Sequence, residues 1–119
     1  MKLRIQGNSI RLRVTQSEIA QLRHVGRIES SLELTPGRSL SYAVEASLHA
    51  RSALAVFDGR TILVSLPAGE VNNWVGSEQI GIEGGTEAGV QILVEKDFPC
   101  RHKPAQADSD SYPDPPKAA

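Results

Sequence analysis

The chain has 119 residues and a formal net charge of −1 at pH 7, which fits a single domain and argues against a nucleic-acid binder. Aromatic residues make up only 4% of the chain, so base-stacking platforms are not expected. The single cysteine excludes an internal disulfide and suits a reducing cytosol. No apolar run reaches the roughly 20 residues that cross a membrane, and the first residues lack the apolar core of a signal peptide. We therefore expect a soluble, cytoplasmic protein.

Residues 2–14 (KLRIQGNSIRLRV) predict a β-hairpin. Apolar and polar residues alternate on both sides of Gly7-Asn8, and both turn residues tolerate positive φ. A two-residue loop at Gly7-Asn8 produces the pairs Gln6–Ser9, Ile5–Ile10, Arg4–Arg11, Leu3–Leu12 and Lys2–Arg13. One face of the hairpin then carries Leu3, Ile5, Ile10, Leu12 and Val14, and the other carries Lys2, Arg4, Arg11 and Arg13. We call these four cations the basic quartet.

The basic quartet requires anions, because like charges directly opposite one another destabilise a sheet. The anions can be water and salt, protein carboxylates such as Glu29, Glu33 and Glu45, or the acidic groups of a ligand or protein partner. Charged stripes on strands are usually solvated or salt-bridged. Arginine also suits phosphate, because its guanidinium group binds two oxygens at once. The nature of these anions is the main functional question that the sequence raises.

Thr15 and Glu18 form a predicted capping box at the start of a short helix that ends at Gly26. Its apolar residues, at helical spacing, are Ile19, Leu22 and Val25. Two strands follow, the first over residues 27–35, and Pro36-Gly37 signals the turn between them. A three-residue loop, Pro36-Gly37-Arg38, pairs Leu34 with Leu40 and Leu32 with Tyr42.

A third hairpin is predicted over residues 52–57 and 61–66. Two loop registers are open: Asp58-Gly59 is the favoured dipeptide, whereas comparison with the first hairpin favours Gly59-Arg60. Both faces of these strands are largely apolar, which predicts burial on both sides. Pro67 then begins a second helix, with Trp74 as its core anchor.

The fourth hairpin joins residues 79–83 to residues 89–97. Its predicted apolar face consists of Ile80, Ile82, Val90, Ile92 and Val94. From residue 99 the composition shifts to Pro, Ala, Asp and Ser, which predicts a flexible tail. We therefore expect one β-rich domain over residues 1–98 and a Pro-rich tail over residues 99–119.

The two halves of the domain resemble each other. Residues 5–10 match residues 57–62 at a spacing of 52, and residues 42–45 match residues 92–95 at a spacing of 50. Each half reads strand, strand, helix, strand, strand, so we predict a duplication with repeats at about 1–48 and 52–98. The predicted fold is α+β, with eight mostly antiparallel strands and two short helices. The two ββαββ units are related by a pseudo-twofold axis, in a barrel-like or layered arrangement.

Three carboxylates are candidates for a second site. Glu45 and Glu95 are related by the repeat, and Asp97 lies on the same strand face as Glu95. They can hold Mg²⁺ against a phosphate, or they form a polar rim above the strands. Cys100 and His102 supply only two metal ligands, whereas a closed zinc site needs four. No Ser-His-Asp arrangement, P-loop or HExxH motif is present, so we expect neither catalytic residues nor a metal centre.

The opening KLRIQGNSIRLRVTQSE and the segment ILVEKDFPC (residues 92–100) resemble a small bacterial family of unknown function over most of residues 1–103. That resemblance implies no activity and no catalytic residues. The duplicated strand order is also distantly similar to the triphosphate-tunnel fold of adenylate cyclases and thiamine triphosphatases. That fold usually opens with an acidic E-x-E-x-K strand, whereas this chain opens with a basic strand at residues 2–6.

The sequence thus predicts a binding or interaction module without evident catalytic machinery, whose partner is an acidic small molecule or a protein. The alternative is a phosphohydrolase or a nucleotide- or polyphosphate-binding protein. It would use the basic quartet with Glu45, Glu95 and Asp97, and Mg²⁺ as its only cofactor. An enzyme requires these groups to converge in a concave pocket, whereas a binding module requires only a charged patch.

Overall fold

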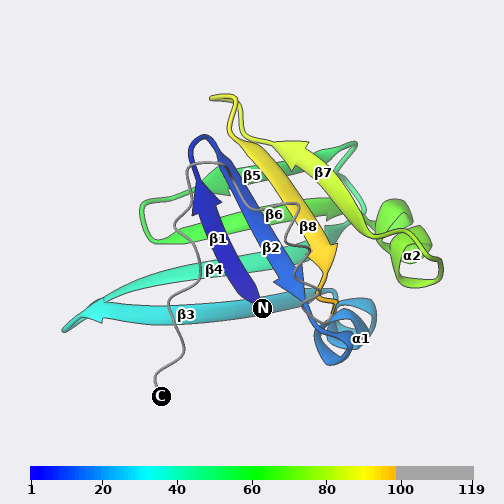
Figure 1. Ribbon diagram of the computed structural model, residues 1–119, viewed down its shortest axis with the longest axis horizontal. Coiled ribbons are helices and arrows are strands. Elements are labelled where there is room, and N and C mark those ends of the chain that lie inside the picture. The colour runs from blue at the N-terminus through cyan, green and yellow to red at the C-terminus, as the bar shows by residue number, and fades with distance from the viewer. Residues whose placement is uncertain (99–119) are drawn as a thin grey trace, which may run out of the picture.

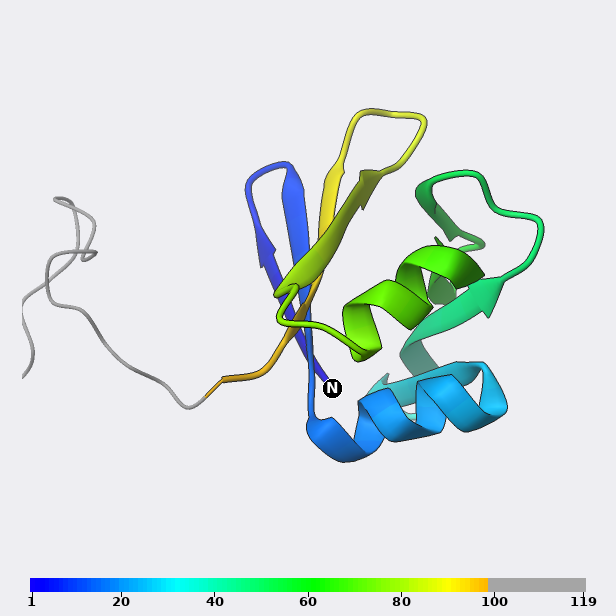
Figure 2. The ribbon, with the colours of Figure 1, turned by 90° about the vertical axis from the view of Figure 1, so that its right-hand side faces the viewer.

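A computed structural model describes residues 1–98 of the chain. Eight strands form one curled sheet with the shape of a half-barrel, and two helices lie at one end of it (Figures 1 and 2). The elements are β1 (Lys2–Gln6), β2 (Ser9–Val14), α1 (Gln16–Val25), β3 (Arg27–Thr35), β4 (Arg38–Ser47), β5 (Ala53–Phe57), β6 (Thr61–Pro67), α2 (Ala68–Val75), β7 (Gly81–Gly85) and β8 (Gln91–Lys96). The predicted α+β class is confirmed.

The strand order in the sheet is β1-β2-β8-β7-β5-β6-β4-β3. Strands of one hairpin pair antiparallel, whereas the three junctions between hairpins, β2–β8, β7–β5 and β6–β4, are parallel. Strands β1 and β3 are the edges, and neither has a second strand partner within residues 1–98. The β2–β8 and β6–β4 junctions correspond to each other in the two ββαββ units. A duplication requires this correspondence, but the duplication itself stays a prediction.

The first hairpin has the predicted register. All five pairs, from Lys2–Arg13 to Gln6–Ser9, are present. The turn depends on Gly7, whose φ of 54° lies in the left-handed region that glycine adopts without strain. The same alternation therefore separates the apolar face of the hairpin from the basic quartet, as predicted.

The start and end of α1 are also confirmed. The Thr15 side chain accepts a hydrogen bond from the Glu18 N–H, and the Glu18 carboxylate accepts one from the Thr15 N–H, which completes the capping box. At the other end Gly26 adopts φ 86° and its N–H donates to the carbonyl of Leu22. Leu22 is the buried residue of this helix.

The predicted pairing of the second hairpin is wrong by two residues. Leu32 faces Leu40 and Ser30 faces Tyr42, because the loop contains only Pro36-Gly37 and a bulge near Leu34 absorbs the extra residue. Proline followed by a glycine with φ 75° is the combination of a type II turn. The Glu33 carboxylate reinforces this turn by accepting a hydrogen bond from the Gly37 N–H at 2.9 Å.

In the third hairpin Phe57 faces Ile62, so the loop is Gly59-Arg60 and matches that of the first hairpin. The Asp58 side chain selects this loop, because it accepts hydrogen bonds from the N–H groups of Arg60 and Thr61. The same backbone hydrogen bonds lower the pKa of Asp58. The predicted burial on both sides is wrong. The outward-facing Leu54 and Val56 are 41% and 51% exposed, because both helices pack on the other face.

One apolar core fills the helical end of the half-barrel. Leu22 of α1 and Val71 and Trp74 of α2 pack there with sheet residues from both halves of the domain, such as Val14 and Val64. Trp74 is fully buried, as predicted, and its Nε1–H donates to the Ile80 carbonyl at 2.9 Å. Ile80 precedes β7 and is 58% exposed, so the prediction that it belongs to the apolar strand face is wrong.

Candidate functional site

The basic quartet lies on the outer face of the first hairpin. The alternating residues on the other face include Leu12 and Val14, which are fully buried. The Lys2 side chain is 73% exposed, whereas those of Arg11 and Arg13 are 43% and 35% exposed. The two arginines of β2 are therefore partly covered, while the cations of the edge strand β1 are open to solvent.

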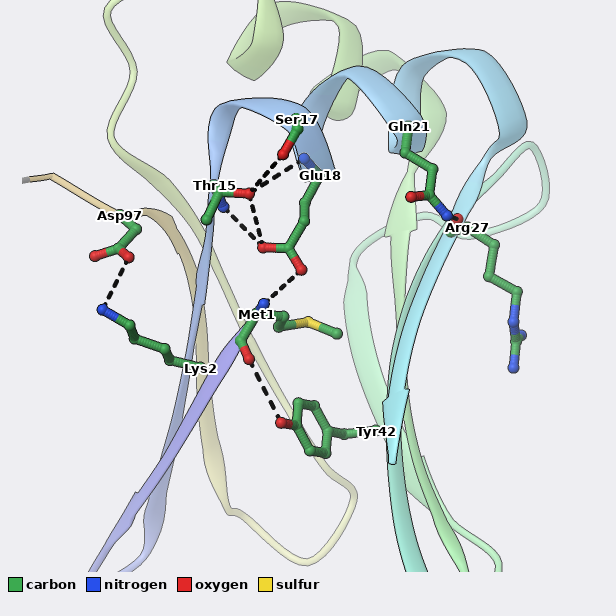
Figure 3. A network of polar contacts seen from close by, with 9 residues as sticks. All are labelled: Met1, Lys2, Thr15, Ser17, Glu18, Gln21, Arg27, Tyr42 and Asp97. Carbon is green, nitrogen blue, oxygen red and sulfur yellow. Dashed lines mark hydrogen bonds and ion pairs between the residues drawn. The ribbon is translucent and has the colours of Figure 1, made fainter. Parts of the chain in front are cut away.

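Two carboxylates from the end of the domain neutralise part of this charge. The parallel β2–β8 register places Arg13 beside Glu95, and the Arg13 Nε–H donates to the Glu95 carboxylate at 3.0 Å. Arg11 Nε lies 3.5 Å from the same oxygen. Asp97 forms an ion pair with Lys2 at 3.1 Å (Figure 3). The Asp97 N–H donates to the Val14 carbonyl, which fixes the end of this strand against β2.

Arg4 is the cation that this arrangement leaves without a carboxylate. It faces Arg11 across the β1–β2 ladder and forms no ion pair with any residue of the described part of the chain. Glu95, shared by two arginines, is closer to Arg13 than to Arg11. Positive charge therefore remains at the Arg4–Arg11 pair, where like charges directly opposite each other need an external anion.

The carboxylates expected to balance the quartet do not do so. Glu29 and Glu45 both form ion pairs with Arg27, at 3.1 Å each, and Glu33 supports the Pro36-Gly37 turn. The quartet uses Glu95 and Asp97 instead. Their role depends on which strands become neighbours, and alternation along the sequence contains no signal for that.

Glu45 and Glu95 are not brought together. Both face outward, but β7, β5 and β6 lie between their strands, which corresponds to about 19 Å along the sheet at about 4.8 Å per strand. Within residues 1–98 no group of three or more potential metal ligands is present. The other metal-ligand candidates, Cys100 and His102, lie outside the described residues.

An open depression of about 410 Å³ adjoins the basic quartet. It lies over β2, β8 and β7, and its lining includes the side chains of Arg11, Gln91 and Glu83. Arg11 therefore borders this depression, together with the acidic residue Glu83. A second depression beside α2 contains Glu70, Glu83 and Glu95 and is acidic, so it does not extend the basic surface.

A further charged cluster surrounds the start of β1. The α-amino group of Met1 forms an ion pair with Glu18, and the Tyr42 hydroxyl donates to the Met1 carbonyl at 3.4 Å (Figure 3). Burial raises the pKa of Glu18, but hydrogen bonds from the amino group and from Thr15 outweigh it, so the net pKa is lowered. The sequence predicted the capping role of Glu18 and missed this ion pair.

Comparison with known proteins identifies a family but no activity. None of the curated proteins and none of the solved structures matches the chain. Within residues 1–98, neither helix is long and apolar enough to cross a membrane. A family model matches residues 1–116. The chain therefore belongs to the family of unknown function DUF7009.

Proposed function

We propose that this domain is a binding module that accepts carboxylate side chains of a protein partner on its basic face. The Arg4–Arg11 pair carries the proposal, because two cations face each other there and Arg4 has no carboxylate within residues 1–98. A carboxylate placed between them would relieve their repulsion and form charge-assisted hydrogen bonds with one or both guanidinium groups.

The surroundings of this pair favour a protein surface over an enclosed small-molecule site. The quartet lies on the outer face of the sheet, and the adjoining depression is open. On this proposal the module works in the cytoplasm and requires no cofactor. The alternative, a phosphohydrolase or nucleotide-binding protein with Mg²⁺, needs the cations and all three carboxylates together. The distance between Glu45 and Glu95 along the sheet makes that alternative weaker.

Poly-L-glutamate is a suitable probe of the basic face. We expect it to bind the protein in isothermal titration calorimetry and to raise the thermal midpoint by mass action. Arg4→Ala and Arg11→Ala should each weaken this binding at least about fivefold, and salt should weaken it further. Arg60→Ala is the matched control, because Arg60 is exposed at the β5–β6 turn and forms its hydrogen bonds there through its backbone N–H and carbonyl, which alanine retains.

Phosphate, pyrophosphate and nucleotides, with and without Mg²⁺, form the second arm of this experiment. A larger thermal shift with any of them than with poly-L-glutamate would favour the phosphohydrolase alternative. Poly-L-glutamate binding that is absent, or unchanged by both arginine substitutions, would contradict the proposed function.

A further inference from the structure

The two edge strands of the half-barrel have complementary surfaces. On the outer side β1 presents Lys2 and Arg4, whereas β3 presents Glu29 and Glu33. On the inner side Ile5 and Leu32 are 61% and 55% exposed. Edge strands with open backbone groups accept further strands, and these two offer opposite charges on one side and apolar residues on the other.

The second ββαββ unit contains a pairing between its corresponding strands. There β5 and β7 pair in parallel, with Ala53 beside Gly84 and Leu54 beside Gly85. Equivalent positions in the two halves follow from the hairpin registers. Ile5 and Phe57 both face the first isoleucine of the next strand, a spacing of 52 (from 5 to 57). Ile28 and Ile82 both face a buried valine, a spacing of 54 (from 28 to 82).

Transferring the β5–β7 pairing by these spacings defines a register for β1 and β3. Ala53 and Gly84 correspond to Met1 and Ser30. Continued along both strands, the same register places Leu3 opposite Leu32 and Arg4 opposite Glu33. In this pairing apolar residues meet on the inner side, and Arg4 gains the carboxylate that no residue within 1–98 of its own chain provides.

Within one chain the two edges do not meet. They start close together, where the Tyr42 side chain spans from β4 to the carbonyl of Met1 (Figure 3). From there β1 and β3 diverge, so that Leu3–Gln6 points away from the protruding tip of the β3–β4 hairpin (Figure 1). Pairing within the chain would have to close this divergence, whereas pairing with a second copy would not.

We propose that two copies of this chain associate through parallel pairing of β1 of one copy with β3 of the other, with Arg4 opposite Glu33. The pairing is reciprocal in a twofold dimer, so the Arg4–Glu33 contact occurs twice. This inference rests on the proposed function, since it names Glu33 of a second copy as a carboxylate that the basic face accepts.

Charge reversal tests the register directly. Sedimentation velocity of the full chain over a dilution series, from roughly millimolar to low micromolar, should show a monomer–dimer equilibrium. Arg4→Glu and Glu33→Arg should each raise the dimer dissociation constant about 100-fold, because each creates a like-charge contact twice per dimer. The double variant restores opposite charges in every copy and should return to within about threefold of the parent.

Two further variants keep the test interpretable. Arg60→Glu introduces the same charge change away from both edges and should leave the dissociation constant unchanged. Glu33→Gln retains the acceptor for the Gly37 N–H, so it preserves the turn and should weaken the dimer less than Glu33→Arg does. Circular dichroism confirms that each variant is folded.

A chain that stays monomeric up to about 0.5 mM would overturn the dimer. A dimer that resists the single reversals, or is not restored by the double variant, would overturn this pairing. Poly-L-glutamate binding, measured on the same proteins, separates the two proposals. A monomer that still binds the polymer through Arg11 retains the proposed function and loses only the second copy as its partner.

Discussion

Strands β5 and β7 hold the same positions in the second predicted ββαββ unit as β1 and β3 hold in the first, yet only β5 and β7 are paired. At the closed junction a Cβ atom on Gly84 would lie 2.3 Å from the Ala53 carbonyl oxygen. The strands can therefore approach only because Gly84 has no side chain and that of Ala53 is small. At the open edges Met1 and Ser30 take their places, and the Tyr42 side chain lies between β4 and β1.

We interpret the small residues Ala53 and Gly84 as the reason why β5 and β7 can approach each other closely. Hydrophobic patterning is similar in the two halves, because Leu3, Ile5, Ala53 and Ala55 all face inward. The edges of β1 and β3 stay unpaired within residues 1–98. Such edges can pair with a strand of another chain.

The largest effect on stability is expected from adding a side chain between β5 and β7. Gly84→Ala places a methyl group within 2.5 Å of the Ala53 Cβ, so the strands must separate. We expect a loss of about 3 kcal/mol in unfolding free energy, measured by urea denaturation. Gly69→Ala is the control, since a Cβ there meets nothing within 4 Å and alanine favours the helix. Equal losses of unfolding free energy for Gly84→Ala and Gly69→Ala would contradict our explanation of why β5 and β7 can pair.

The next effect compares the two outward carboxylates. Glu95→Gln should cost about 1–2 kcal/mol, because Glu95 has only 15% of its side chain exposed and serves both Arg11 and Arg13. Glu45→Gln should cost about 0.5 kcal/mol, because that side chain is 33% exposed and, within residues 1–98, pairs with a single basic residue, Arg27. Urea denaturation at low and high salt measures both. A larger loss of unfolding free energy for Glu45→Gln than for Glu95→Gln would contradict the conclusion that the ion pairs of Glu95 stabilise the domain more.

A smaller, pH-dependent effect is expected at the start of β1. The pKa of Glu18 is lowered in the folded state, so the unfolded chain binds the proton more readily as the pH falls. The contribution of Glu18 to the unfolding free energy is fully present at pH values above its pKa in the unfolded chain, about 4.3. It is lost as the pH falls through the pKa of Glu18 in the folded state. Glu18→Gln should therefore cost about 1 kcal/mol at pH 7 and flatten the decline below pH 5. Parallel pH profiles for the two proteins would contradict this role.

The smallest effect is expected from the Tyr42 hydroxyl group, which links β4 to Met1. Tyr42→Phe removes a hydrogen bond of 3.4 Å to the Met1 carbonyl, a distance at which such a bond is weak. Thermal denaturation should show a loss within about 0.5 kcal/mol. A loss above about 1.5 kcal/mol would mean that the hydroxyl, rather than the packing of the ring, holds the start of β1 near β4.

Local features of this fold were predictable from the sequence. Alternation and Gly7-Asn8 determine the register of the first hairpin, and Thr15 with Glu18 determines the start of α1. The basic quartet could therefore be found on one face. The second hairpin was mispaired because the bulge near Leu34 leaves no mark in the alternation.

Long-range features were not predictable in the same way. The parallel junctions join strands far apart in the chain, such as β2 and β8, and no turn connects them. The partners of the quartet, Glu95 and Asp97, depend on that junction, so the site could be only half predicted. The predicted burial of Leu54 and Val56 was wrong for a related reason. Apolar composition does not reveal that both helices pack on one face of the sheet.

The most direct test of the central claim is amide hydrogen exchange at low and high protein concentration. The account predicts slow exchange at the β5–β7 junction at every concentration, and exchange in β1 and on the open edge of β3 that slows as the concentration rises. Exchange at these two edges that is equally fast at all concentrations would contradict the claim that they are a pairing surface.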